Sequence, residues 1–147
     1  MDKNPRANNR ILLILLSAWA PVLVWAIVIF SFSALPTSPV AEIHWQDFII
    51  KKSAHIIEYG VFAILLYRAF IMSNLKKKKA ILYAFLIAVL YGVTDEYHQS
   101  YTPGRDPKVR DIFFDSFGAL MSLYFINKIL PRSPYGVKLL AERFKLI

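Results

Sequence analysis

Long apolar segments separated by short polar connections dominate the chain. No charged residue occurs between Arg10 and Glu42, and an apolar run of 22 residues fills positions 11–32. A helix of about 20 apolar residues crosses the hydrocarbon core of a bilayer. Less apolar segments of similar length follow, so the pattern predicts four membrane spans, at residues 11–33, 54–73, 80–98 and 112–130. We therefore expect an all-α fold: one four-helix transmembrane bundle with short loops, covering residues 1–147.

Two amphipathic segments lie outside these spans. The first surrounds Ile43, Trp45, Phe48 and Ile49, and its alternation of apolar and polar residues predicts a piece lying in the membrane interface. In the second, the tail after Pro131, the apolar residues recur at helical spacing. The tail is therefore predicted to be a short interfacial C-terminal helix.

Composition narrows the class of protein. Hydrophobic residues make up 56% of the chain and charged residues 19%, which excludes a disordered chain and disfavours a water-soluble globule. The absence of cysteine excludes a disulfide scaffold, a zinc finger and a thiol nucleophile. Basic residues before the first apolar run also occur in cleaved signal peptides, but this run is longer than their usual core and further spans follow.

The net charge of +8 is unevenly distributed along the chain. Of the 18 basic residues, 13 lie in the N-terminal segment, the Lys76–Lys79 turn, the tail or the adjoining span ends, and 5 lie on the opposite side. Basic residues favour the cytoplasmic side, so both termini are predicted to be cytoplasmic. The lysines are expected to face anionic membrane lipids, and no aromatic residues interleave them as nucleic-acid stacking would require. No nucleic-acid partner is predicted.

Polar residues gather at the extracytoplasmic ends of the last three predicted spans. Ionisable residues inside a membrane normally face the bundle interior or a wet cavity, so this gathering is a candidate site. Small residues at 118 and 122 continue the stripe of Asp111 and Asp115, which lets another helix approach closely. The loop between the last two spans adds Arg105 and Arg110. The candidate site residues are Lys52, His55, Glu58, Asp95, Glu96, His98, Gln99, Arg105 and Asp111.

Two segments carry a resemblance to a known family. These are Lys52-Ser-Ala-His55-Ile-Ile-Glu58-Tyr59-Gly and Asp95-Glu96-Tyr97-His98-Gln99, the latter followed by Pro103-Gly104-Arg105, Asp111 and Gly118. The chain resembles the VanZ-like family over residues 10–125. The resemblance implies a small integral protein of the bacterial cytoplasmic membrane, in a family named for a protein associated with teicoplanin resistance. It implies no settled activity, so function must be argued from the site.

The sequence departs from the family pattern at two positions. Asp115 stands where members often carry Asn, and Ser122 stands where they often carry a second Gly. The first departure adds a carboxylate to the candidate site and changes its charge balance.

The first functional hypothesis is an enzyme that hydrolyses or transfers a phosphate ester of an anionic envelope lipid or cell-wall precursor. Lys52 and Arg105, with Gln99, would hold the anionic group. His98 or His55 would act as the nucleophile or the general acid–base group. The carboxylates would orient and tune the imidazoles; these are Asp95, Glu96, Asp111 and Glu58.

Other hypotheses use the same residues differently. A non-catalytic binder or transporter of an envelope lipid or precursor would use the carboxylates to relay protons, and with four spans it would need a homo-oligomer. A divalent metal site is a further alternative because Asp95 and His98 have a spacing found in helical-bundle metal sites, although no cofactor is assigned. Finally, the charges could simply pair with one another, as Lys52–Glu58, Arg105–Asp111 and Asp95–His98.

Overall fold

The computed structural model describes residues 5–35, 44–103, 105 and 108–147, and the side chains of these except at 5–11 and 44. Throughout this part of the chain the regular structure is helical, which confirms the predicted all-α class. The helices are α1 (Pro5–Ser33), α2 (His44–Met72), α3 (Lys77–Gln99), α4 (Val109–Tyr124) and α5 (Tyr135–Arg143). A π-helical turn, η1 (Phe125–Ile129), and a 3-10 turn, η2 (Leu130–Arg132), extend α4.

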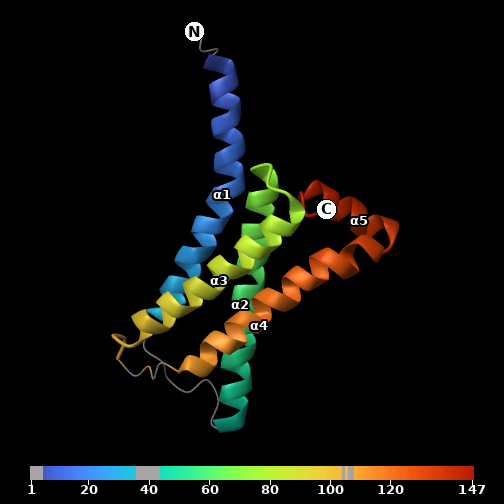
Figure 1. Ribbon diagram of the computed structural model, residues 1–147. Coiled ribbons are helices and arrows are strands. Elements are labelled where there is room, and N and C mark those ends of the chain that lie inside the picture. The colour runs from blue at the N-terminus through green and yellow to red at the C-terminus, as the bar shows by residue number, and fades with distance from the viewer. Residues whose placement is uncertain (1–4, 36–43, 104, 106–107) are drawn as a thin grey trace.

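The four long helices alternate in direction, so their connections fall at two ends of the bundle (Figure 1). One end, which we call the turn end, holds the α2–α3 turn and α5. The other, which we call the loop end, holds the C-terminal ends of α1 and α3 and the N-terminal ends of α2 and α4. Four helical segments are long and apolar enough to cross a membrane, at residues 12–33, 45–72, 77–99 and 109–132. The chain is therefore a multi-pass membrane protein.

The second span begins earlier than the sequence pattern predicted. The segment containing Trp45 and Phe48, which was expected to lie in the membrane interface, is continuous with the span and forms the first turns of α2. No glycine or proline interrupts the chain between it and the apolar span. An ion pair of 2.8 Å between Lys51 and Asp47, at i,i+4 spacing, also supports helix there. Ile43, the first residue of the expected piece, lies outside the described residues.

The α2–α3 turn depends on a left-handed residue. Asn74 has a φ of 62°, which asparagine tolerates better than most residues. This conformation lets the Leu75 amide donate to the Phe70 carbonyl at 3.0 Å, the pattern that closes many helix C-termini. The chain therefore reverses within a few residues and places the lysines at the start of α3.

Glycines set the distance between α2 and α4. A Cβ at Gly118 would overlap the carbonyl group of Ile56, and one at Gly60 would lie 2.6 Å from Ser122 Oγ. These contacts confirm the expected close approach along the stripe of small residues on α4. Because the two backbones meet here, the side chains one to two turns nearer the loop end face each other across a short gap.

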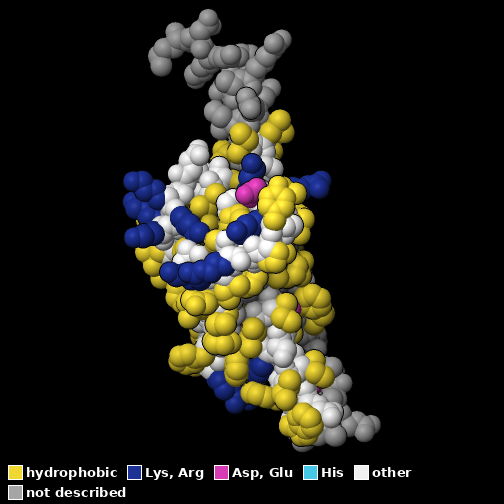
Figure 2. Space-filling model, turned by 90° about the vertical axis from the view of Figure 1, so that its right-hand side faces the viewer, with side chains coloured by type: hydrophobic (Ala, Val, Ile, Leu, Met, Phe, Trp, Pro, Cys, Tyr) yellow, Lys and Arg dark blue, Asp and Glu magenta, His cyan; other side chains and the backbone are white. Residues whose placement is uncertain are grey.

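The buried core lies mainly between α2, α3 and the second half of α4. Tyr59, Phe62 and Tyr67 of α2 are almost fully buried. Alanines on α3, at 80, 84 and 88, let this helix pack closely. α1 packs on one side, where the Tyr91 hydroxyl donates to the Ala26 carbonyl at 2.7 Å. On the face shown in Figure 2, Lys and Arg side chains gather toward both ends and hydrophobic side chains cover the region between them, as a bilayer requires.

Candidate functional site

Two charged pairs join α2 to α4 near the loop end. Lys52 Nζ lies 2.6 Å from Asp111 Oδ2, and His55 Nδ1 lies 2.9 Å from Asp115 Oδ1. The pairs are stacked because the partners are separated by three residues on α2 and by four on α4, about one helical turn. The His55 and Asp115 side chains are 13% and 1% exposed, so the carboxylate of the deeper pair is buried while the imidazole keeps some exposure.

The buried end of α3 adds a second polar group. Gln99 Nε2 donates to Asp95 Oδ2 at 2.8 Å within the same helix. Glu96 Oε2 accepts the backbone amide of Lys108 at 2.9 Å. Lys108 is the N-cap residue of α4, so Glu96 satisfies one of the amides that a helix start leaves without an intrahelical partner. These contacts attach the C-terminal end of α3 to the beginning of α4.

Glu58 and Tyr59 lie between these two groups. Glu58 interacts electrostatically with His55, Asp95 and Asp115. Its backbone carbonyl accepts a hydrogen bond of 2.9 Å from Trp25 of α1. Tyr59 is fully buried, and its hydroxyl has no hydrogen-bond partner among the described residues. A phenol at this depth without a partner is costly, which makes Tyr59 a candidate site residue that the sequence reasoning did not select.

Gly92 of α3 opens the space for the deepest carboxylate. A Cβ at Gly92 would lie 3.2 Å from Asp115 Oδ2 and 3.4 Å from a ring carbon of Tyr59. The absence of a side chain therefore lets Asp115 reach the interface of α2, α3 and α4. Asp115 is the most buried carboxylate of the site, although it was not among the candidate site residues. Its place on the stripe of Asp111 was the sequence signal that could have selected it.

Arg105 has a different environment from the one that its proposed role suggests. Its guanidinium donates to the backbone carbonyls of Leu35 at 3.3 Å and Phe32 at 2.5 Å, at the C-terminal end of α1. A cation there complements the helix dipole. Arg105 also interacts electrostatically with Glu58. Its assignment as an anion-binding residue stays a prediction, but two of its nitrogen atoms are already engaged.

His98 also faces α1. Its ring lies 4.4 Å from the Phe30 ring, centroid to centroid, with 33° between the planes. Its Nε2 is buried and has no hydrogen-bond partner among the described residues. The structure therefore separates the roles of the two candidate histidines, because His55 pairs with a carboxylate and His98 stacks on an aromatic ring.

None of the three charge pairings considered from the sequence is formed. Lys52 pairs with Asp111 rather than Glu58, and Asp95 bonds Gln99 rather than His98. Arg105 bonds backbone carbonyls rather than Asp111. For Lys52 the reason is the close crossing of α2 and α4, which brings its ammonium group to Asp111, a contact between helices that sequence spacing cannot predict.

A second cation, Arg110, lies near the Lys52–Asp111 pair. Lys52 Nζ is 5.8 Å from the centroid of the Phe48 ring, and Arg110 Cζ is 4.9 Å from it. Both distances suit cation–π contacts, so one aromatic side chain holds two cations near each other. Arg110 was not among the candidate site residues.

At the loop end, the hydrogen bond that Tyr101 donates to Tyr97 at 2.7 Å raises the pKa of the Tyr101 phenol.

Acidic groups dominate the interior of the site. Four carboxylates are between 1% and 6% exposed. A carboxylate in a low-dielectric region is costly unless it is paired or shares a proton. The buried carboxylate oxygens without a hydrogen-bond partner, among the described residues, are Glu96 Oε1, Asp111 Oδ1 and Asp115 Oδ2. The geometry can therefore receive and pass protons close to two cations, Lys52 and Arg110. No three metal-ligating side chains converge within the described part of the chain.

Comparison with known protein families gives a match. The family model described as VanZ/LLP1 matches residues 3–130, which includes the candidate site, the first three spans and all but the last two residues of the fourth. No curated protein and no solved structure matches the chain.

Proposed function

The chain belongs to the VanZ/LLP1 family, and we propose that it performs acid–base chemistry on an anionic envelope lipid or cell-wall precursor at the loop end of the bundle. The proposed reaction is hydrolysis or transfer of a phosphate ester. The observation that carries this proposal is the His55–Asp115 pair of 2.9 Å, whose carboxylate is 1% exposed. An imidazole held at one nitrogen by a buried carboxylate has its other nitrogen oriented for proton transfer.

The residues at the α2–α4 interface have distinct roles in this scheme. Lys52 and Arg110 hold the anionic group above Phe48, and His55 lies one turn deeper. In hydrolysis, His55 Nε2 accepts a proton from water as the water oxygen bonds to phosphorus. The phosphorus–oxygen bond to the lipid then breaks, and the leaving alkoxide takes a proton back from the imidazolium. Asp115 Oδ1 stabilises the charged imidazole between the two proton transfers.

Phosphate release by the purified protein tests this reaction. We would use a polyprenyl phosphate and a glycerophospholipid phosphate as substrates, in detergent. His55→Gln is expected to lower the rate by about 100-fold or more, the usual contribution of a general acid–base group. Lys51→Gln is the control, because Lys51 pairs with Asp47 on its own helix. His98→Gln is informative, since a loss as large as that of His55→Gln would transfer the central role to His98.

A second candidate function is a proton-coupled binder or transporter of the same ligand class, acting as a homo-oligomer. The excess of buried carboxylates favours it, because protons could pass between them without any bond cleavage. Retention of the lipid by wild-type protein but not by Lys52→Gln, without phosphate release, would support this function and contradict catalysis.

Metal analysis of the same preparation tests the remaining alternative. If the wild-type protein holds stoichiometric metal and Asp115→Asn does not, the site binds a divalent cation instead of transferring protons.

We place the protein in the bacterial cytoplasmic membrane with both termini in the cytoplasm. The unequal distribution of basic residues supports this orientation. A reporter enzyme that works only in the cytoplasm is expected to be active when it is fused after Ile147. Periplasmic activity of the fusion would invert the orientation and place the candidate site on the cytoplasmic side.

A further inference from the structure

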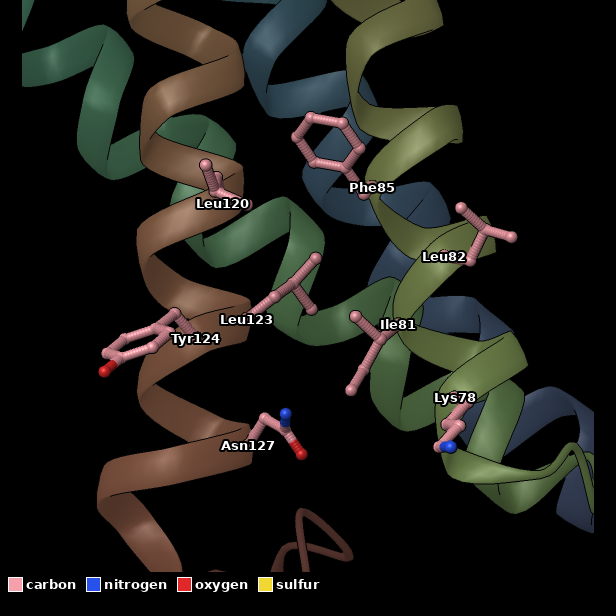
Figure 3. A pocket seen from close by; sticks show the side chains of 8 residues that line it. All are labelled: Lys78, Ile81, Leu82, Phe85, Leu120, Leu123, Tyr124 and Asn127. Atoms are coloured by element: carbon pink, nitrogen blue, oxygen red, sulfur yellow. The ribbon is translucent and has the colours of Figure 1, made fainter.

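A groove lies between α3 and the α4–η1 segment, at the end opposite the candidate site. Its volume is about 310 Å³. Figure 3 shows Ile81 and Phe85 of α3 facing Leu123 and Leu120 of α4, with Lys78 and Asn127 nearer the turn end. The groove uses none of the residues assigned to the proposed function, so the two sites can be tested separately.

The polarity of the groove changes along the two helical segments that form its walls. Lys78 lies in the first turn of α3, and Phe85 lies seven residues later. Leu120 precedes Asn127 by seven residues on the antiparallel helix. Seven residues of helix rise about 10 Å, so both walls pass from a polar residue to a large apolar one over the same depth. This gradient matches a lipid, which has a polar headgroup and an apolar chain.

The polar opening of the groove is basic. Lys78 belongs to the run Lys76–Lys79, and it has no ion-pair partner among the described residues. Among the described residues that line the groove, none is acidic. Lys128 and Arg132 lie in the turns that end α4, at the same end of the bundle. The charge of this opening therefore complements an anionic headgroup.

The backbone beside the opening is irregular. Asn127 lies in the π-helical turn η1, where the Leu130 amide bonds the Phe125 carbonyl. In an α-helix, the amide of the residue four places after Asn127 would donate to the Asn127 carbonyl. That residue is Pro131, which has no N–H. π-Helical turns inside α-helices occur frequently at functional sites. Here the turn sets the position of the only lining amide side chain in the described part of the groove.

We propose that this groove binds one anionic phospholipid from the leaflet at the turn end. One acyl chain lies between Ile81, Phe85, Leu120 and Leu123. The headgroup phosphate contacts the Lys78 ammonium group and the Asn127 amide. In the orientation predicted from the basic residues this is the cytoplasmic leaflet, where anionic lipids attract basic juxtamembrane segments.

Native mass spectrometry of the purified protein tests the charge requirement. The probes are phosphatidylglycerol and phosphatidylcholine with the same acyl chains. Wild-type protein is expected to retain one phosphatidylglycerol with about five-fold higher affinity than phosphatidylcholine, the contribution of one lysine near a membrane surface. Lys78→Gln should remove this preference and Lys77→Gln should keep it. Equal retention of both lipids by wild-type protein, or an equal loss in both variants, would overturn the proposal.

A second pair of variants tests the apolar part of the groove. Leu120→Trp puts a large ring into the groove from an exposed position, whereas Leu86→Trp adds the same ring to an exposed position of α3 that does not line it. Retained phosphatidylglycerol should be lost in Leu120→Trp and kept in Leu86→Trp. Unchanged retention in Leu120→Trp would show that the lipid lies elsewhere. Because neither variant touches the His55–Asp115 pair, phosphate release should not change, and failure of either proposal leaves the other intact.

Discussion

The two halves of the α2–α4 interface differ in chemistry although the same two helices form both. Toward the turn end, glycines and a serine bring the backbones together, and the Gly118 position leaves no room for a Cβ. Toward the loop end, the same interface contains the Lys52–Asp111 and His55–Asp115 pairs. The comparison indicates that the close-packed half sets the helix separation at which the charged half can form short contacts. The predictions below test this dependence, beginning with the largest expected effect.

Asp115→Asn should separate the chemistry of the charged half from its packing. Asparagine has nearly the same shape and its oxygen can still accept a hydrogen bond from His55 Nδ1. It cannot stabilise a charged imidazole as a carboxylate does. We expect phosphate release to fall by about 100-fold or more, with little change in thermal stability in detergent. Equal losses of activity and stability would mean that the pair serves the fold alone.

Gly118→Ala should disrupt the close-packed half. The added methyl group meets the backbone of Ile56, which cannot rotate away as a side chain could. We expect the free energy of unfolding to fall by about 3 kcal/mol, as for severe overpacking. Because the helices must separate, the charged half should change as well. A variant with unchanged melting temperature and activity would show that the glycine contact does not control the pairs.

Gly60→Ala should have a smaller effect that a second substitution can relieve. Its Cβ would lie 2.6 Å from the hydroxyl oxygen of Ser122. The expected destabilisation is about 1.5 kcal/mol, within the usual range for overpacking. Ser122→Gly removes that oxygen, so the double variant should recover most of the loss. Additive losses in the double-mutant cycle would show that the two positions do not interact.

Lys51→Gln and Lys52→Gln change adjacent residues, of which only Lys52 lies in the α2–α4 interface. Lys51 pairs within α2 and its side chain is 31% exposed, whereas Lys52 pairs across the interface and is 14% exposed. We expect Lys51→Gln to change stability by less than about 0.5 kcal/mol, as exposed i,i+4 pairs usually do. Lys52→Gln should cost more because it leaves Asp111 buried without its cation. Equal costs would indicate that Asp111 is not sealed by the interface.

Much of the candidate site could be predicted from residue spacing. The positions of Lys52, His55 and Asp111 near one end of their spans indicated that they would gather. The structure pairs Lys52 with Asp111 and His55 with Asp115, which lies on the same stripe of α4 as Asp111. The partners could not be predicted, because they depend on the crossing of two helices rather than on spacing within one. Arg105 illustrates this, since only the position of α1 beside its loop explains its bonds to backbone carbonyls.

The sequence by itself determined the class of structure. Long apolar runs dictate helices that can span a bilayer, because backbone groups in hydrocarbon must bond within the same segment. The positions of the glycines likewise determine where two helices can meet. Only the tertiary structure decided which buried groups became partners, and it made Asp115, a residue noted from sequence as a departure, the partner of His55. The physical reason is that a contact of about 3 Å between side chains depends on the rotation and separation of whole helices, to which many distant residues contribute.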